Sequence, residues 1–261
     1  MSLRPAILSM LLAASTSAAE IIAHRGASHD APENTMASFR LAWEQKADAI
    51  ELDIHLTSDG RIAVIHDPTT KRTAGPDKKI SEQTFDELRG LDAGSWRGPQ
   101  WKAEKIPSLA EVLASMPEGK QVFIEIKCGP EILPELVKVI GAAPCKPSQL
   151  VIIGFNYDTM RKAKALLPQV EMQWIVQPRK DSGGLEPSVD TLIEKALAAK
   201  LDGLDLSSGF AIDAAFTARV HAAKLKLNVW TVDSPEDARR FREAGVDAIT
   251  TNRPALLRQS K

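Results

Sequence analysis

The chain has 261 residues, 44% of them hydrophobic, and a formal net charge of −1. Its length and apolar content fit a single domain with a sizeable core. The balanced charge, with no dominant basic patch, argues against a nucleic-acid partner. No apolar run reaches the roughly 18 residues that a membrane-spanning helix requires, so we expect no stable insertion into a membrane.

The N-terminus has the three parts of a signal peptide. Residues 1–5 carry one positive charge, residues 6–14 are apolar, and residues 15–19 are small. This order predicts cleavage after Ala19 and a secreted or periplasmic protein, whose mature chain is one domain over residues 20–261. The alternative is a short N-terminal core helix.

Short apolar runs alternate with longer amphipathic stretches after residue 20. The runs predict strands at residues 21–24, 49–54, 62–66, 122–126, 150–155, 170–176, 203–206, 227–232 and 248–250. The amphipathic stretches predict helices at residues 34–45, 130–140, 157–167, 189–199, 211–223 and 235–244. Asn34 is the expected N-cap of the first helix, and Gly245 is the expected stop of the last. Such alternation is typical of parallel βα units.

About eight strands in this length predict an α/β fold of the TIM type, a (βα)8 barrel, with an open doubly wound sheet as the alternative. One unit is irregular, because only residues 57–61 separate the second and third expected strands. A parallel crossover needs about a dozen residues, so that unit either lacks its helix or pairs unusually. Residues 67–107 lack a βα rhythm and predict a small insertion after the third strand, over one mouth of the barrel.

Charged residues gather at the ends of the early strands, where the catalytic groups of such barrels lie. The ends of the first four expected strands carry His24 and Arg25, Glu51 and Asp53, His66, and Glu125 and Lys127.

Three of these acids are predicted to bind a metal ion. Glu51 and Asp53 are two residues apart on the second expected strand, so both point to one face. The apolar residues that flank Glu125 place it on the inner face of the fourth expected strand. Buried carboxylates repel one another unless a cation lies among them, and Mg²⁺ or Ca²⁺ suits oxygen ligands. The alternative is a set of internal salt bridges, for example Glu51 with Arg25 and Glu125 with Lys127.

The remaining residues predict a phosphate site. Arg25 and Lys127 require an anion if the carboxylates bind a metal, and a phosphate satisfies this requirement. His24 and His66 then suit proton transfer to and from a P–O bond, although each alone is more typical of a core histidine than of a catalyst. His55 is interpreted as a framework residue.

The ordered motifs resemble the glycerophosphodiester phosphodiesterases over residues 21–254. The matching strings are His24-Arg25-Gly26, Pro32-Glu33-Asn34-Thr35, Glu51-x-Asp53, Thr57-x-Asp59-Gly60, His66-Asp67, Ile106-Pro107-Ser108-Leu109, Glu125-x-Lys127, Trp230-Thr231-Val232 and Thr250-Thr251-Asn252-Arg253-Pro254. Ser108 stands where Thr is common in the family, and Asn252 where Asp often occurs.

This resemblance implies hydrolysis of glycerophosphocholine or glycerophosphoethanolamine to glycerol 3-phosphate and an alcohol, with one divalent cation. It implies that His24 and His66 act as general acid and base, and that Trp230 forms a wall for the glycerol or head group. It also implies attack by the glycerol 2-hydroxyl and a cyclic phosphate that water then opens. The alternatives are a phospholipase on the same barrel and a non-catalytic phosphodiester-binding protein. A barrel has no free sheet edge, so a monomer or weak oligomer is expected.

Overall fold

The computed structural model describes residues 19–181 and 184–260 of the chain. Apart from Ala19, the predicted signal peptide lies outside the described residues. Among the helices that are described, none is long and apolar enough to cross a membrane.

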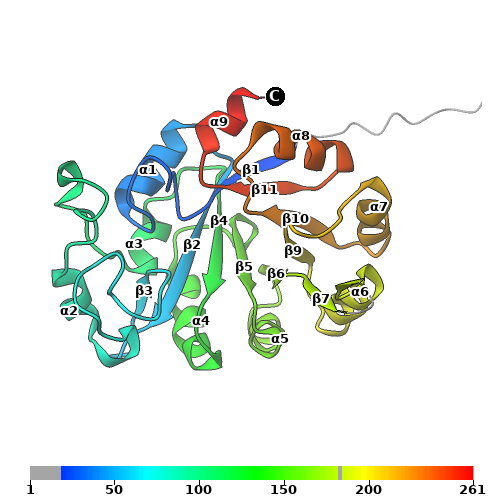
Figure 1. Cartoon of the computed structure of the whole chain (residues 1–261). Helices are drawn as coiled ribbons and strands as arrows, with labels where there is room; N and C mark the ends of the chain where they lie inside the picture. The colour runs from blue at the N-terminus through cyan, green and yellow to red at the C-terminus, as the bar shows by residue number, and fades with distance from the viewer. Residues whose placement is uncertain (1–18, 182–183, 261) are drawn as a thin grey trace, which may run out of the picture.

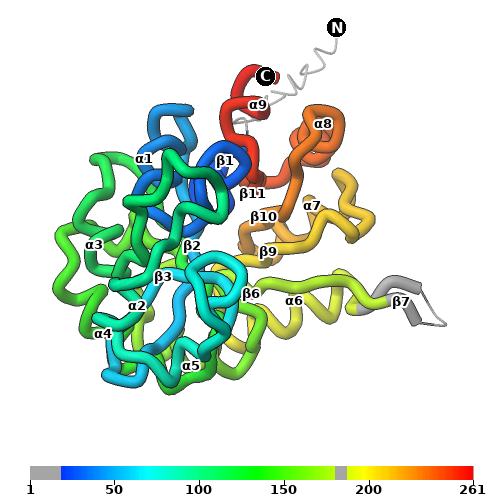
Figure 2. The backbone as a smooth tube through the Cα atoms, turned by 60° about the vertical axis from the view of Figure 1, so that its left-hand side comes forward, coloured from blue at the N-terminus to red at the C-terminus, as the bar shows by residue number. Residues whose placement is uncertain are grey.

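Eight parallel strands close into a barrel, as predicted (Figure 1). In order around the barrel they are β1 (Glu20–Ala23), β2 (Ala49–Leu56), β4 (Gln121–Ile126), β5 (Leu150–Gly154), β6 (Glu171–Val176), β9 (Gly203–Ser207), β10 (Lys226–Trp230) and β11 (Ala248–Thr251). Strand β1 pairs with both β2 and β11, so the sheet has no edge within the barrel, and the open doubly wound alternative is wrong. The elements from the two ends of the chain therefore lie side by side (Figure 2).

Helices surround the barrel and bury one face each against it. They are α1 (Met36–Glu44), α3 (Leu109–Ala114), α4 (Leu133–Ala142), α5 (Tyr157–Leu166), α6 (Val189–Ala198), α7 (Ala214–Ala222), α8 (Pro235–Ala244) and α9 (Pro254–Gln259). Helix α8 shows which residues determine where a helix begins and ends. Ser234 caps its first turn, Pro235 is its first residue, and Gly245 ends the helix in the left-handed conformation. The 3₁₀ turns η3 (Pro130–Ile132) and η4 (Pro147–Gln149) precede α4 and β5.

The start of α1 differs from the sequence prediction. Thr35, not Asn34, is the N-cap, and its hydroxyl accepts a hydrogen bond from the Ser38 amide. Asn34 instead adopts a left-handed conformation (φ 56°), and its side-chain amide donates to Asp53. Asn34 is therefore part of the site rather than the cap of the helix.

The third predicted strand is not a barrel strand. Strand β3 (Ile62–Val64) pairs antiparallel with the end of β2, so that Ile54 lies opposite Val64 and Leu56 opposite Ile62. The short turn at residues 57–61 permits a hairpin and excludes a parallel crossover. The irregular unit is thus a case of unusual pairing.

The segment between β3 and α3 is the predicted insertion. It contains η1 (Ile80–Glu82), α2 (Phe85–Gly90) and η2 (Pro99–Trp101). It has its own small core, and in Figure 1 it lies beside β2 and β3 at the left of the barrel. That core consists of Ala63, Ile65, Ala74, Ile80, Phe85, Leu88, Ala93 and Ile106. A further hairpin, β7 (Arg179–Asp181) with β8 (Gly184–Glu186), joins β6 to α6 and was not predicted.

Alternation along the barrel strands places the acids. Ile50, Leu52 and Ile54 belong to the core between the barrel and its helices, whereas neighbours such as Ala49 and Phe123 belong to the core inside the barrel. The residues between the outward ones must point inward because side chains alternate along a strand. Glu51, Asp53 and Glu125 therefore point into the barrel near its carboxyl end.

Candidate active site

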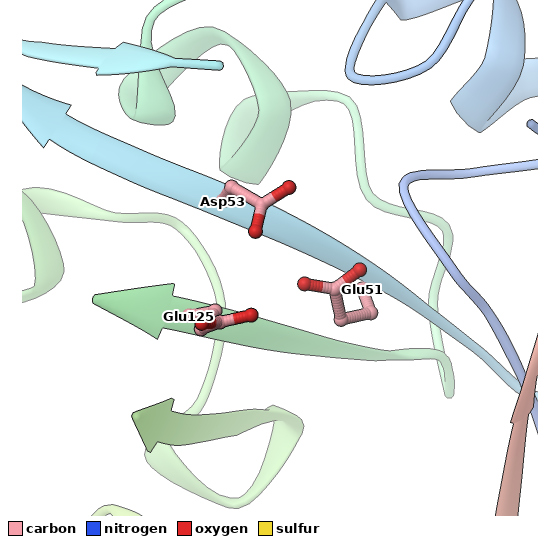
Figure 3. Close-up of side chains that lie close together, drawn as sticks. All are labelled: Glu51, Asp53 and Glu125. Carbon is pink, nitrogen blue, oxygen red and sulfur yellow. The ribbon is translucent and has the colours of Figure 1, made fainter. Parts of the chain in front are cut away.

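Three buried carboxylates meet at the carboxyl end of neighbouring strands. Glu51 and Asp53 lie on β2, Glu125 lies on β4 as the register partner of Asp53, and one oxygen from each lies within 4.8 Å of the others. Figure 3 shows the three side chains on the same side of the two strands, with their oxygens towards a common space. Their exposed fractions are between 0 and 7%. The sequence prediction that these acids share one inner face is confirmed.

The three carboxylates cannot all be ionised at low cost without a cation. Burial and the charges of Asp53 and Glu125 raise the pKa of Glu51 well above its ordinary value. Burial and the charge of Asp53 also raise the pKa of Glu125, to about 7. Glu51 Oε1 and Asp53 Oδ1 are buried and receive no hydrogen bond from the described residues. A cluster of carboxylate oxygens with unsatisfied acceptors fits a hard divalent cation such as Ca²⁺ or Mg²⁺.

Asp53 differs from its neighbours because cations surround it. Burial opposes its ionisation, but the charges of Arg25 and Lys127 outweigh burial and lower its pKa. Arg25 Nε lies 3.3 Å from Asp53 Oδ2, and Lys127 Nζ lies 3.6 Å from Oδ1. The side-chain amide of Asn34 donates a third contact, at 2.8 Å. Asp53 is thus the member of the cluster whose ionised form the neighbouring cations favour.

His24 lies just beyond β1, with its ring next to the carboxylates. Its Nδ1 lies 2.7 Å from Asn252 Oδ1, and its Nε2 lies 4.0 Å from Glu51 Oε2. Asn252 donates its own amide to Asp233, so its oxygen faces His24 and accepts from Nδ1–H. Burial, and then the charge of Arg25, lower the pKa of His24 to about 4. The imidazole is therefore neutral near pH 7, with Nε2 able to accept a proton.

The turn after β1 also positions Arg25. Its backbone is left-handed (φ 55°), and its main-chain N–H donates to Glu51 Oε2 at 2.9 Å. Its guanidinium donates to Glu33 at 2.9 Å. Gly26 follows with φ 80°, where a Cβ atom would lie 2.4 Å from the Ser38 hydroxyl oxygen. Only glycine fits this turn, which places the Arg25 amide against the cluster.

His66 lies on the other side of the cluster, after β3. Its Nδ1 lies 2.6 Å from Asp67 Oδ1, and its Nε2 lies 3.1 Å from Lys127 Nζ. Because the lysine ammonium can only donate, Nε2 accepts and Nδ1 carries the proton. Lys127 also donates to Glu125 at 2.8 Å. Lys127 therefore connects His66 to the carboxylate cluster.

An insertion residue holds these groups in place. The Arg72 guanidinium pairs with both Asp67 and Glu33, at 2.7 Å each. Asp67 contacts His66 and Glu33 contacts Arg25, so one arginine connects both sides of the site. No sequence pattern marked Arg72 as a site residue, because its position depends on how the insertion folds. Glu33 belongs to the Pro32-Glu33-Asn34-Thr35 motif, but its contacts with Arg25 and Arg72 could not be inferred from the sequence.

A pocket of about 240 Å³ opens beside the cluster. Seven of the eight predicted site residues line it, and Asp53 lies beneath them. Trp230 forms part of its wall, edge-to-face with Phe155 at 5.6 Å between ring centroids. Asp205 also lines it and was not predicted. A larger hollow of about 810 Å³ lies at the opposite end of the barrel and contains none of the predicted residues.

Part of the salt-bridge alternative is present. Glu125 pairs with Lys127 as that alternative required, but the Arg25 guanidinium pairs with Asp53 and Glu33 rather than with Glu51. Within the described part of the chain, these ion pairs leave Glu51 Oε1 and Asp53 Oδ1 without a hydrogen bond, so they do not complete the site. His55 is buried, and its Nε2 lies 3.0 Å from the main-chain oxygen of His66, in a supporting position.

Comparisons with known proteins agree on one family. Residues 24–256 match the model of the glycerophosphoryl diester phosphodiesterase family. A glycerophosphodiester phosphodiesterase of Caldanaerobacter subterraneus is 35% identical, over 91% of this chain and 95% of that protein. A phosphodiesterase of Oleispira antarctica, solved in complex with its product sn-glycerol-3-phosphate, has a TM-score of 0.84 and 29% identity, over 93% of this chain and 96% of that one.

Proposed function

Because the chain belongs to the glycerophosphoryl diester phosphodiesterase family, its reaction is the hydrolysis of glycerophosphodiesters, and we propose how its residues perform it. The substrates are glycerophosphocholine or glycerophosphoethanolamine, and the products are glycerol 3-phosphate and the free alcohol. The observation that carries the proposal is the placement of two histidines, each with an acceptor Nε2, on either side of a buried carboxylate cluster.

The phosphate binds between the cluster and the two cations. Glu51, Asp53 and Glu125 would hold one Ca²⁺ or Mg²⁺, which would neutralise their repulsion and withdraw charge from a phosphate oxygen. Arg25 and Lys127 would then direct donors towards the other phosphate oxygens. Their present pairing with Asp53 and Glu125 places both cations at the mouth of the cluster, where the anion would lie.

His24 and His66 transfer the protons. One, with Nε2 unprotonated, removes the proton from the attacking hydroxyl. The other, whose Nε2 must first take up a proton from solvent, donates that proton to the oxygen of the leaving alcohol. If the glycerol 2-hydroxyl attacks, a cyclic phosphate forms, and water opens it with the two roles reversed. Asn252 and Asp67 each accept the Nδ1 proton of one histidine, which leaves both Nε2 atoms as the reactive positions.

Pocket size supports a small substrate. A pocket of about 240 Å³ accommodates a glycerol phosphate rather than a whole phospholipid. The Oleispira enzyme holds sn-glycerol-3-phosphate, and this product suits the pocket described here. The predicted signal peptide would deliver the enzyme to the periplasm or beyond.

The test is release of glycerol 3-phosphate from glycerophosphocholine and glycerophosphoethanolamine, measured with a coupled enzyme assay. We expect turnover with Ca²⁺ or Mg²⁺, loss of turnover in excess EDTA, and recovery when either cation is restored. Full activity in EDTA would contradict the cation's role. Binding of these substrates without release of glycerol 3-phosphate would favour the non-catalytic alternative.

A further inference from the structure

The active-site pocket has a second end, which the proposed chemistry does not use. Phe155, Ile175 and Trp230 line this end, and one carboxyl group, that of Asp205 on β9, lies among them. Strand β9 is four strands from β2 around the barrel, so Asp205 faces the cluster from the opposite wall.

Asp205 is a buried acid with an unsatisfied oxygen. Its exposed fraction is 2%, and its buried Oδ1 receives no hydrogen bond from the described residues. The cations of the site, Arg25 and Lys127, contact the other acids instead. Burial, and then the charge of Glu125, raise the pKa of Asp205 to about 8. An unsatisfied buried polar group is costly, so its retention here indicates a partner that arrives with the substrate.

Contacts with Trp230 and Ile175 determine where Asp205 lies on the pocket wall. The Trp230 indole donates to the main-chain oxygen of Asp205 at 3.2 Å, and Ile175 is the register partner of Asp205. These contacts hold the carboxyl group at the base of an apolar wall. A protonated carboxyl group offers one donor and one acceptor, which matches the needs of a single hydroxyl group.

Two hollows meet at this wall, and a bound substrate would divide between them. The pocket of about 240 Å³ adjoins a second hollow of about 620 Å³, and the two share Phe155 and Ile175. The arm of the substrate that varies, the alcohol, has room to extend into the larger hollow. The glycerol arm, which is constant, fits the smaller one beside the cluster.

We propose that Asp205 binds the C1 hydroxyl of the glycerol arm and thereby selects glycerol phosphodiesters over analogues without that hydroxyl. This inference rests on the proposed function. On the cyclic route the C2 hydroxyl lies beside phosphorus, so the C1 hydroxyl is the group left to meet Asp205. Asp205 is therefore a specificity-determining residue rather than an acid or base.

The test compares two substrates in each variant. Glycerophosphocholine is compared with 2-hydroxypropyl phosphocholine, which keeps the C2 hydroxyl and lacks only the C1 hydroxyl. We expect the wild type to favour the former by roughly ten- to a hundredfold in kcat/KM, the range for one buried hydrogen bond. Asp205→Leu should bring this ratio close to one, and Asp205→Asn should leave an intermediate ratio. Asp190→Asn, at an exposed acid on α6, should keep the wild-type ratio.

Both kcat/KM values in the ratio are measured on the same preparation of a variant. A partial loss of folded protein lowers both values equally and does not change the ratio. Calorimetry of glycerol 3-phosphate against 2-hydroxypropyl phosphate gives the same comparison without turnover. An unchanged ratio in both Asp205 variants would overturn the proposal. The proposal would also be overturned if the Asp205 variants lost much kcat/KM with a choline head group but little with an uncharged glycerol head group. That result would show that Asp205 binds the ammonium of the head group. A wild type that releases no glycerol 3-phosphate would instead refute the proposed function.

Discussion

Glu51 illustrates how one residue couples stability to cation binding. Its Oε2 accepts a hydrogen bond from the Arg25 main-chain N–H, while its buried Oε1 has no hydrogen-bond partner among the residues that the structure describes. Its pKa is raised by burial and by two neighbouring acids. The folded protein therefore keeps the Glu51 proton at a pH where the unfolded chain has lost it. Without a cation, the contribution of Glu51 to stability therefore falls as the pH rises above the ordinary pKa of a glutamate, about 4.3.

Replacing Glu51 with glutamine removes this titration. In EDTA, we expect Glu51→Gln to melt at a higher temperature than the wild type at pH 8, and by a smaller margin at pH 5. For a chain of this size, each 1 kcal/mol shifts Tm by roughly 2–4 °C. Added Ca²⁺ or Mg²⁺ should raise the Tm of the wild type at pH 8 and raise that of the variant much less, which calorimetry would measure.

Glu82→Gln is the matched control, because Glu82 is exposed and pairs with Lys79 on the surface. It should respond to cation and pH as the wild type does. An equal rise in Tm on cation addition in Glu51→Gln and wild type would remove Glu51 from the cation site.

Single residues could be predicted where their contacts follow from strand geometry. Glu51 and Asp53 face inward because of their spacing, and Glu125 follows by the same alternation. Arg72 and Asp205 could not be predicted. The contacts of Arg72 depend on the fold of the insertion, and Asp205 has no charged neighbour in sequence to mark it as part of a site.

The turn between β1 and α1 is the element on which the site depends most closely. Arg25, Gly26 and Asn34 all have positive φ angles, and each contacts either the cluster or helix α1. Gly26 passes directly over Ser38, whose hydroxyl donates to the Arg25 main-chain oxygen at 2.9 Å. The backbone must take this path for the Arg25 amide to reach Glu51.

Substitution of Gly26 should be far more costly than substitution of another glycine with a similar backbone. Gly60 has φ 75° and nothing within 4 Å of an added Cβ, so Gly60→Ala should lose about 1 kcal/mol from backbone strain alone. Gly26→Ala adds a clash with the backbone and side chain of Ser38, so a loss of about 3 kcal/mol or more is expected. Urea unfolding at equilibrium would measure both. Equal losses would show that the turn relaxes freely.

Sequence periodicity predicted the barrel elements but not every pairing. Alternating apolar runs gave the eight barrel strands to within a few residues, because buried parallel strands are almost continuously apolar. The direction of β3 cannot be read from its own residues, since Ile62–Val64 would suit either orientation. The β7–β8 hairpin was missed because its strands are short and polar.

At the scale of the whole molecule, closure of the barrel assembles the site. Residues on β2, β4, β5, β6, β9, β10 and β11, with others just after β1 and β3, line one pocket although they are far apart in sequence. The small core of the insertion fixes Arg72, which then pairs with residues on both sides of the cluster. Strand count and motif order were sufficient to predict the barrel and the family. The depth of the pocket and its second, apolar end required the packing of strands distant in sequence.

The most direct test of the account is the turnover of glycerophosphocholine by His24→Ala and His66→Ala with saturating Ca²⁺ or Mg²⁺. Each variant should keep its fold by circular dichroism and lose roughly 10²- to 10⁴-fold in kcat, the usual contribution of a positioned acid or base. His221→Ala, which changes an exposed histidine paired with Asp247, should retain the wild-type kcat. A kcat near that of the wild type in either site variant would contradict the assignment of this histidine pair.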